Sequence, residues 1–142
     1  MQGRNFLLAS EHLLKRKEEA MLRSAISRGY YALFHESRIF LSALKLASSK
    51  GPQAHGEVRH RLQNCGDEQM QEISQLLAQL HKQRLLADYD LDDATIFDTN
   101  TCALLVKSAD IGIKYLDTAR QSTSQCAQIR NVILQYERRP QK

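Results

Sequence analysis

The chain has 142 residues, of which 42% are hydrophobic and 25% are charged, and its formal net charge is +4. A chain of this length can bury about 70% of its unfolded surface, which predicts one domain spanning residues 1–142 with a sizeable core. No apolar run reaches the roughly 18 residues of a membrane span, and charged residues interrupt the N-terminal segment where a signal peptide would have its apolar core. We therefore expect a cytoplasmic protein with no membrane partner. The mild positive charge permits an anionic ligand without identifying one.

Apolar residues recur at three- and four-residue spacing along most of the chain, which predicts helices and no strands. The expected helices cover residues 5–17, 18–47, 53–64, 68–88, 99–121 and 125–139. Helix-breaking residues gather most clearly at 48–52. Asp67 is suited to cap the helix that follows it, and Asp98 or Thr99 is suited to cap the helix at 99–121. The predicted fold class is therefore all-α, a small up-and-down bundle of five to six helices.

The cysteines indicate reduced thiols. Cys65, Cys102 and Cys126 are an odd number without close spacing, which argues against a disulfide framework and against a zinc site. The chain also lacks the glycine-rich phosphate loops and the zinc-binding HExxH pattern. We expect no cofactor and no metal.

Residues 20–46, AMLRSAISRGYYALFHESRIFLSALKL, combine an apolar face with a polar stripe. Arg28 and His35 are seven residues apart, so at about 100° per residue both leave the same face of the helix. The polar stripe comprises Ser24, Arg28, Tyr31, His35, Arg38 and Ser42. Gly29 lies in the middle of this helix at a cost of about 1 kcal/mol against Ala, which predicts a close backbone approach by a neighbour or a ligand.

Two other positions have alternative interpretations. Arg84 and Asp88 are four residues apart on one helix and can form an ion pair, or Arg84 can lean toward the polar stripe as a second cation of an anion site. His55, near the start of the short helix at 53–64, is either a structural residue or a site residue.

Three segments in this order, SRGYYALFHESRIFL, AHGEVRHRLQ and RLLADYDLDD, resemble the HEPN domain. The closest likeness is to the small stand-alone HEPN proteins of prokaryotes that occur with nucleotidyltransferase partners, and it covers roughly residues 5–120. The resemblance implies a helical bundle that is often dimeric. Many members are metal-independent endoribonucleases that use an Arg followed shortly by a His, and these positions match Arg28 and His35 as catalytic residues.

Cleavage of RNA without a metal requires a base for the 2′-hydroxyl, an acid for the leaving 5′-oxygen and a cation near the phosphate. His35 can serve as the base or the acid and Arg28 can hold the phosphate, so one helix supplies at most half of the machinery. The expected substrate-binding residues are Tyr31, Arg38, His55 and Arg84. A two-fold homodimer would bring two histidines and two arginines to one phosphate, giving a 2′,3′-cyclic phosphate and a 5′-hydroxyl.

The first hypothesis is accordingly a HEPN ribonuclease that acts on RNA as the toxin of a toxin–antitoxin pair, with a nucleotidyltransferase as antitoxin. A second is a non-catalytic HEPN module that dimerises and recruits a nucleotidyltransferase or a nucleotide. A third is nonspecific RNA binding through a basic tail that contains Arg138, Arg139 and Lys142. In the non-catalytic interpretation the polar stripe is a buried seam in the bundle or in a dimer interface, with Arg28 paired to an acidic residue.

Overall fold

The computed structural model describes residues 1–93 and 97–140, and within these ranges the chain is α-helical and contains no strand. The helices are α1 (Arg4–Leu14), α2 (Glu19–Ala43), α3 (Gln53–Gln63), α4 (Glu68–Tyr89), α5 (Thr99–Arg120) and α6 (Thr123–Glu137). The predicted all-α bundle is confirmed. In the described part of the chain, no helix has both the length and the apolar character required to cross a membrane.

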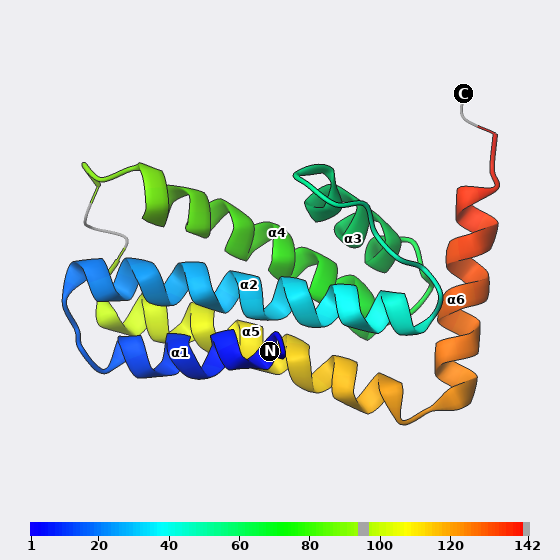
Figure 1. Cartoon of the computed structure of the whole chain (residues 1–142), viewed down its shortest axis with the longest axis horizontal. Helices are drawn as coiled ribbons and strands as arrows, with labels where there is room; N and C mark the ends of the chain where they lie inside the picture. The colour runs from blue at the N-terminus through cyan, green and yellow to red at the C-terminus, as the bar shows by residue number, and fades with distance from the viewer. Residues whose placement is uncertain (94–96, 141–142) are drawn as a thin grey trace.

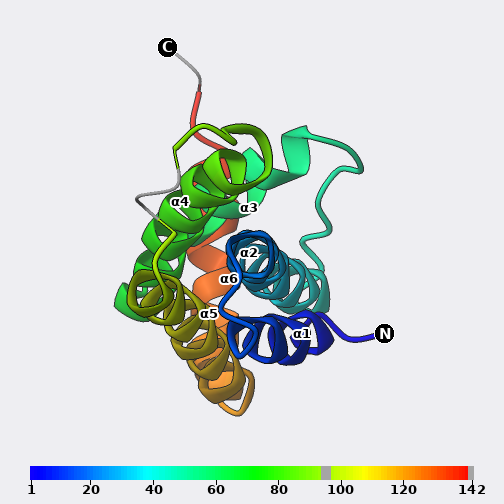
Figure 2. The same cartoon turned by 90° about the vertical axis from the view of Figure 1, so that its left-hand side faces the viewer.

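Helix α2 is the centre of the molecule. Helices α1, α2, α4 and α5 run along the long axis, and consecutive members of this set run in opposite directions (Figure 1). Helix α2 packs against α1, α4 and α5, and more lightly against α3, which itself packs on α4. The end-on view shows α2 with α1 on one side and α3 and α4 on the other (Figure 2). Helix α6 stands across the far end of α5 (Figure 1).

The helix starts follow from side-chain caps, which satisfy backbone N–H groups that have no partner within the helix. Asp67 accepts a hydrogen bond from the Met70 amide at 3.0 Å, and Asp98 accepts one from the Thr101 amide at 2.9 Å. Both predicted caps are confirmed. Ser122 caps α6 in the same way, so α6 begins at Thr123, before the predicted start.

Helix α2 ends at Ala43 rather than at the predicted residue 47. Lys45 has φ 65°, and the Leu46 amide donates back to the Leu41 carbonyl at 2.9 Å. This is a left-handed helix stop, and it turns Leu46, which is only 5% exposed, back into the core. The burial of one leucine thus ends the helix ahead of the helix-breaking residues at 48–52.

Gly29 lies on the packed side of α2. A Cβ atom there would lie 3.4 Å from Ser10 Oγ of α1 and 3.7 Å from Val106 Cγ2 of α5. The predicted close approach therefore comes from neighbouring helices, and it leaves the space of an ordinary van der Waals contact.

Arg23 of α2 binds the backbone at the end of α4. Its side chain is 8% exposed and forms an ion pair with Glu19 at 2.9 Å. The guanidinium donates to four carbonyl oxygens, those of Leu86, Ala87, Asp90 and Asp93. It also lies over the Phe97 ring, 4.2 Å from the ring centre. A buried cation therefore binds carbonyl groups at the end of α4 and in the segment that follows it; the Leu86 carbonyl also accepts from the Asp90 amide.

Candidate functional site

The polar stripe of α2 faces solvent in the chain described here. Ser24, Arg28 and Ser42 are exposed, and Tyr31, His35 and Arg38 are half-buried. The stripe therefore does not form a buried seam within the bundle. Its side chains remain available to a ligand or to a second protein.

Arg28 forms no ion pair with any residue in the ranges 1–93 and 97–140, and its guanidinium lies over the Phe6 ring, 5.4 Å from the ring centre. Of its candidate acidic partners, Glu36 pairs with Arg4 and Asp88 pairs with Arg84. The pairing of Arg28 with a carboxylate is thus not found in the described chain. A surface cation without a protein counter-ion is suited to bind an external anion.

His35 lies among three aromatic rings. Phe6, Tyr31 and Phe34 have ring centroids 5.5, 5.9 and 5.4 Å from the imidazole. Burial, reinforced by the charge of Arg38, lowers the pKa of His35 below its usual value. The imidazole is therefore neutral at pH 7, and neither ring nitrogen is hydrogen-bonded by a residue of the described ranges.

Two shallow depressions meet at His35 and Ile39. One, of about 250 Å³, is also lined by Arg38, Ser42, Ala47 and Ser48, so its wall is both polar and apolar. The other, of about 290 Å³, lies on the Phe6 side beside the first three residues of the chain. Arg38 Nε donates to Ser48 Oγ at 3.0 Å, so the loop after α2 holds this arginine at the first depression.

His55 faces α2 from the start of α3. Its Nδ1 is hydrogen-bonded to the Tyr30 hydroxyl, and its ring stacks on Phe34 with centroids 4.3 Å apart. His81 of α4 lies 5.4 Å from His55 between ring centroids. Burial is the main cause that lowers the pKa of both histidines, and neighbouring arginines lower it further. His55 therefore belongs to a second histidine-containing group behind the polar stripe.

Arg84 forms the expected ion pair and also leans toward the polar stripe. Its Nε lies 3.1 Å from Asp88 Oδ2, so the expected ion pair is present. The guanidinium carbon is also 5.2 Å from the centre of the Tyr31 ring and 5.8 Å from that of Tyr89. Arg84 thus reaches Tyr31, on the opposite helix, and connects α4 to the polar stripe.

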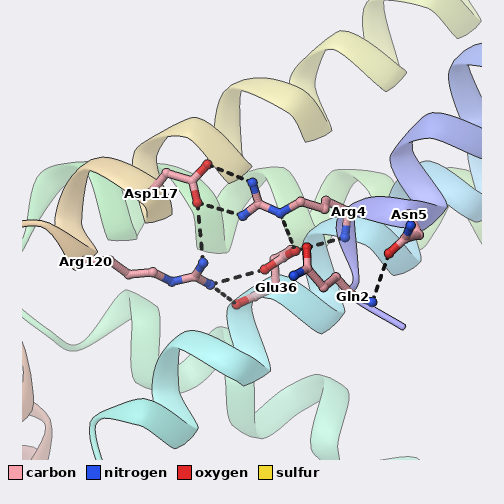
Figure 3. Close-up of polar contacts among 6 residues, drawn as sticks. All are labelled: Gln2, Arg4, Asn5, Glu36, Asp117 and Arg120. Carbon is pink, nitrogen blue, oxygen red and sulfur yellow. Dashed lines mark hydrogen bonds and ion pairs between the residues drawn. The ribbon is translucent and has the colours of Figure 1, made fainter.

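A charged network fixes the helix turn that carries His35 (Figure 3). Glu36, whose side chain is 3% exposed, accepts from the Arg4 backbone amide and from Arg4 Nε, and it also pairs with Arg120. Asp117 pairs with Arg4 at 2.8 Å and with Arg120 at 3.4 Å. The network ties α1, α2 and α5 together immediately beside His35, and thereby sets the position of Phe6 and of the imidazole.

Sequence reasoning did not single out His81 or Phe6, and it placed Arg59 only on the side of the short helix at 53–64 that faces solvent or a ligand. His81 and Arg84 are three residues apart on α4, and His55 and Arg59 are four apart on α3, so each pair shares a helix face. These two spacings in the sequence could have predicted that the second histidine-containing group forms between α3 and α4. Phe6 carried no such signal, because its position over α2 depends on how α1 packs. Within the described residues, no three His, Cys, Asp or Glu side chains are placed to hold a metal ion.

Comparisons with protein-family models, with curated proteins and with solved structures found no match to this chain.

Proposed function

We propose that this chain is a HEPN-type, metal-independent endoribonuclease, the toxin of a pair whose antitoxin is a nucleotidyltransferase. The observation that supports the proposal is the polar stripe itself. Arg28, Tyr31, His35 and Arg38 lie on one solvent-facing side of α2, and His35 has an unpaired imidazole with a lowered pKa. A neutral imidazole at pH 7 is the protonation state that a general base requires.

In the proposed reaction, His35 removes the proton of a ribose 2′-hydroxyl. The 2′-oxygen then forms a bond to the adjacent phosphorus, and the bond from phosphorus to the 5′-oxygen breaks. Arg28 and Arg38 stabilise the additional negative charge on the phosphate oxygens. The products are a 2′,3′-cyclic phosphate and a 5′-hydroxyl.

The leaving 5′-oxygen needs a proton, and one His35 cannot act as base and acid at the same moment. A second copy of the chain, related by a two-fold axis along the polar stripe, would supply a second imidazole and a second Arg28. The proposed enzyme is therefore a homodimer in which the polar stripes face each other, with RNA between them.

Purified protein should cleave mixed RNA, but not a matched DNA, in the presence of EDTA. His35→Ala and Arg28→Ala should each lose this cleavage. His12→Ala and Arg16→Ala are matched controls, because both residues are exposed and lie outside the stripe. Absence of cleavage by a folded dimer, or equal cleavage by His35→Ala, would overturn the proposal.

A second candidate is a non-catalytic HEPN dimer that recruits a nucleotidyltransferase. The observation in its favour is that Arg28 and His35 both contact the Phe6 ring, which covers part of the imidazole that a base must expose. In this case the protein should bind its partner with equal affinity before and after His35→Ala, and neither form should cleave RNA.

A further inference from the structure

Behind the polar stripe, side chains of α2, α3 and α4 form a positively charged group. The proposed roles of Arg28 and His35 do not account for this group. We call it the basic group: Tyr30, His55, Arg59, His81 and Arg84. Every member except Tyr30 is half-buried, so the group has access to solvent.

The charges of this group are all of one sign. Arg59 and Arg84 both lower the pKa of His55 and of His81, and Arg38 lowers that of His55 further. Of the acidic residues on the same helices, Glu57 of α3 is bonded to the amide and the hydroxyl of Ser49 and does not neutralise the group. Asp88 of α4 contacts both Arg84 and Ser27, so it offsets part of the Arg84 charge and leaves Arg59 without a counter-ion.

Several polar atoms of this group have no hydrogen-bond partner among the described residues. His81 Nδ1 is buried without a hydrogen-bond partner. Arg84 Nε is also buried, and its contact with Asp88 lacks hydrogen-bond alignment. The Arg59 guanidinium makes no hydrogen bond or ion pair within residues 1–93 and 97–140, and only the Arg59 backbone carbonyl has a partner outside its helix, the Ser74 hydroxyl. Buried donors and cations without partners are costly, and a bound anion would satisfy them.

The geometry points to a binding site for a dianionic phosphate group, held between α3 and α4 by Arg59, Arg84 and the imidazoles of His55 and His81. The guanidinium carbon of Arg84 lies over the Tyr31 and Tyr89 rings, 5.2 and 5.8 Å from their centres. The Tyr30 hydroxyl is hydrogen-bonded to His55 Nδ1, which leaves Nε2 as the ring nitrogen of His55 for the ligand.

Phosphate suits this group better than a carboxylate would. Two arginines can each donate two hydrogen bonds to a tetrahedral oxyanion, which offers more acceptor oxygens than a carboxylate does. The same dianion would favour protonation of His55 and His81, which the arginines now oppose. The groups that face these imidazoles are Tyr30, Tyr31 and Arg38 from α2, Arg59 from α3, and Arg84 from α4.

The site borders the polar stripe through Arg84 and includes two of the expected substrate-binding residues, His55 and Arg84, but phosphate binding there does not require cleavage. It can hold the phosphate of a free mononucleotide or the 5′-phosphate of an RNA strand, and these two sources share one chemistry. Phosphate binding should therefore be measured both on the parent protein and on His35→Ala. If cleavage fails but both proteins bind phosphate, only the proposed ribonuclease activity is overturned. If neither protein binds phosphate, the phosphate site is overturned.

The test is calorimetric titration with inorganic phosphate, adenosine monophosphate, and a short RNA carrying either a 5′-phosphate or a 5′-hydroxyl. We expect Arg59→Gln and Arg84→Gln each to weaken binding by about tenfold or more, since each loses charge-assisted hydrogen bonds. Arg139→Gln, which removes one exposed positive charge from the tail, should leave binding unchanged. Because Arg84→Gln also breaks the pair with Asp88, Arg59→Gln is the cleaner variant.

Equal affinity for adenosine monophosphate and 5′-phosphorylated RNA would support a site that reads the phosphate alone, and much tighter binding of the RNA would support a site for an RNA end. NMR titration of the histidines gives an independent readout. Saturating phosphate should raise the pKa of His55 and His81, with the exposed His12 as the reference resonance. No binding, or binding that Arg59→Gln and Arg139→Gln reduce equally, would overturn the proposal.

Discussion

The Phe6 ring of α1 stacks on the His35 ring of α2, with centroids 5.5 Å apart and planes inclined by 20°. The Arg28 guanidinium lies over the same Phe6 ring. One aromatic side chain from another helix therefore contacts both residues of the proposed catalytic pair. It contributes to the burial that keeps His35 neutral at pH 7.

Replacement of Phe6 by Ala should raise the pKa of His35 toward its ordinary value, because burial is the main cause of its depression. NMR titration of the imidazole C2 proton measures this directly. Leu8→Ala is the control, since Leu8 is 63% exposed on the same helix. An unchanged His35 titration in Phe6→Ala would show that Phe6 does not set the protonation state.

The free energy of unfolding should fall as the pH is lowered from 7 to 5. The pKa values of His35, His55 and His81 are all lowered in the folded state, so the unfolded chain binds more protons below its histidine pKa of about 6.5. The contribution of these neutral histidines to stability is thus fully present above that pH, and it is lost as the pH falls toward their pKa values in the folded state. Urea denaturation at several pH values measures it.

The matched variants for this pH dependence are His81→Gln and His12→Gln. His81→Gln removes one buried titrating group and should flatten the fall in stability, whereas His12 is exposed at the end of α1 and its replacement should leave the curve unchanged. Equal pH curves for the parent and His81→Gln would contradict the assignment of acid sensitivity to the group formed by α3 and α4.

The fold was predictable because it depends on local signals. Apolar periodicity, Asp67 and Asp98 as caps, and the breakers at 48–52 located the helices to within a few residues. The end of α2 was placed wrongly because Leu46 is buried through a left-handed turn at Lys45, and this tertiary contact leaves no periodic signal.

The site was predictable only in part, for the same physical reason. Arg28 and His35 lie on one face of one helix, so their relation follows from helix geometry alone. The contact of Tyr30 with His55 joins residues 25 positions apart, and that of Glu36 with Arg120 joins residues 84 apart. Such contacts depend on the packing angles of several helices, which the hydrophobic pattern does not specify.

Arg23→Ala should be among the most destabilising substitutions in this chain, at about 3 kcal/mol. It removes an 8% exposed cation and takes away the guanidinium donor that the Ala87 and Asp90 carbonyls have at the end of α4. Chemical denaturation compares it with Arg16→Ala, whose side chain is 62% exposed in a surface pair and should cost about 0.5 kcal/mol or less. Similar losses in the two variants would contradict a clamping role for Arg23.

Glu36→Gln should destabilise the protein by roughly 2 kcal/mol or more, because it removes the buried negative charge shared by Arg4 and Arg120. Asp117→Asn removes a charge from the same network (Figure 3), but the Asp117 side chain is 38% exposed. We expect its cost to be about 1 kcal/mol or less. If Asp117→Asn proved the more harmful, Glu36 would not be the centre of the network.

Gly3→Ala should destabilise the protein by about 1–3 kcal/mol through steric conflict, whereas the same change at Gly56 should not. A Cβ atom at Gly3 would lie 2.9 Å from His35 Cβ and 3.0 Å from the Glu36 amide nitrogen, so the first turn of α1 would have to move. That movement would stretch the bond from the Arg4 amide to Glu36 and shift Phe6 against the imidazole.

Gly56 is the matched control, because it lies inside α3 and a Cβ atom there meets nothing within 4 Å. Gly56→Ala should therefore stabilise the protein by about 1 kcal/mol through helix propensity alone. Thermal denaturation measures both variants, and NMR titration of His35 reports whether the first turn of α1 has moved. A stable Gly3→Ala protein with an unchanged His35 titration would show that the N-terminal turn is not held against α2 at His35.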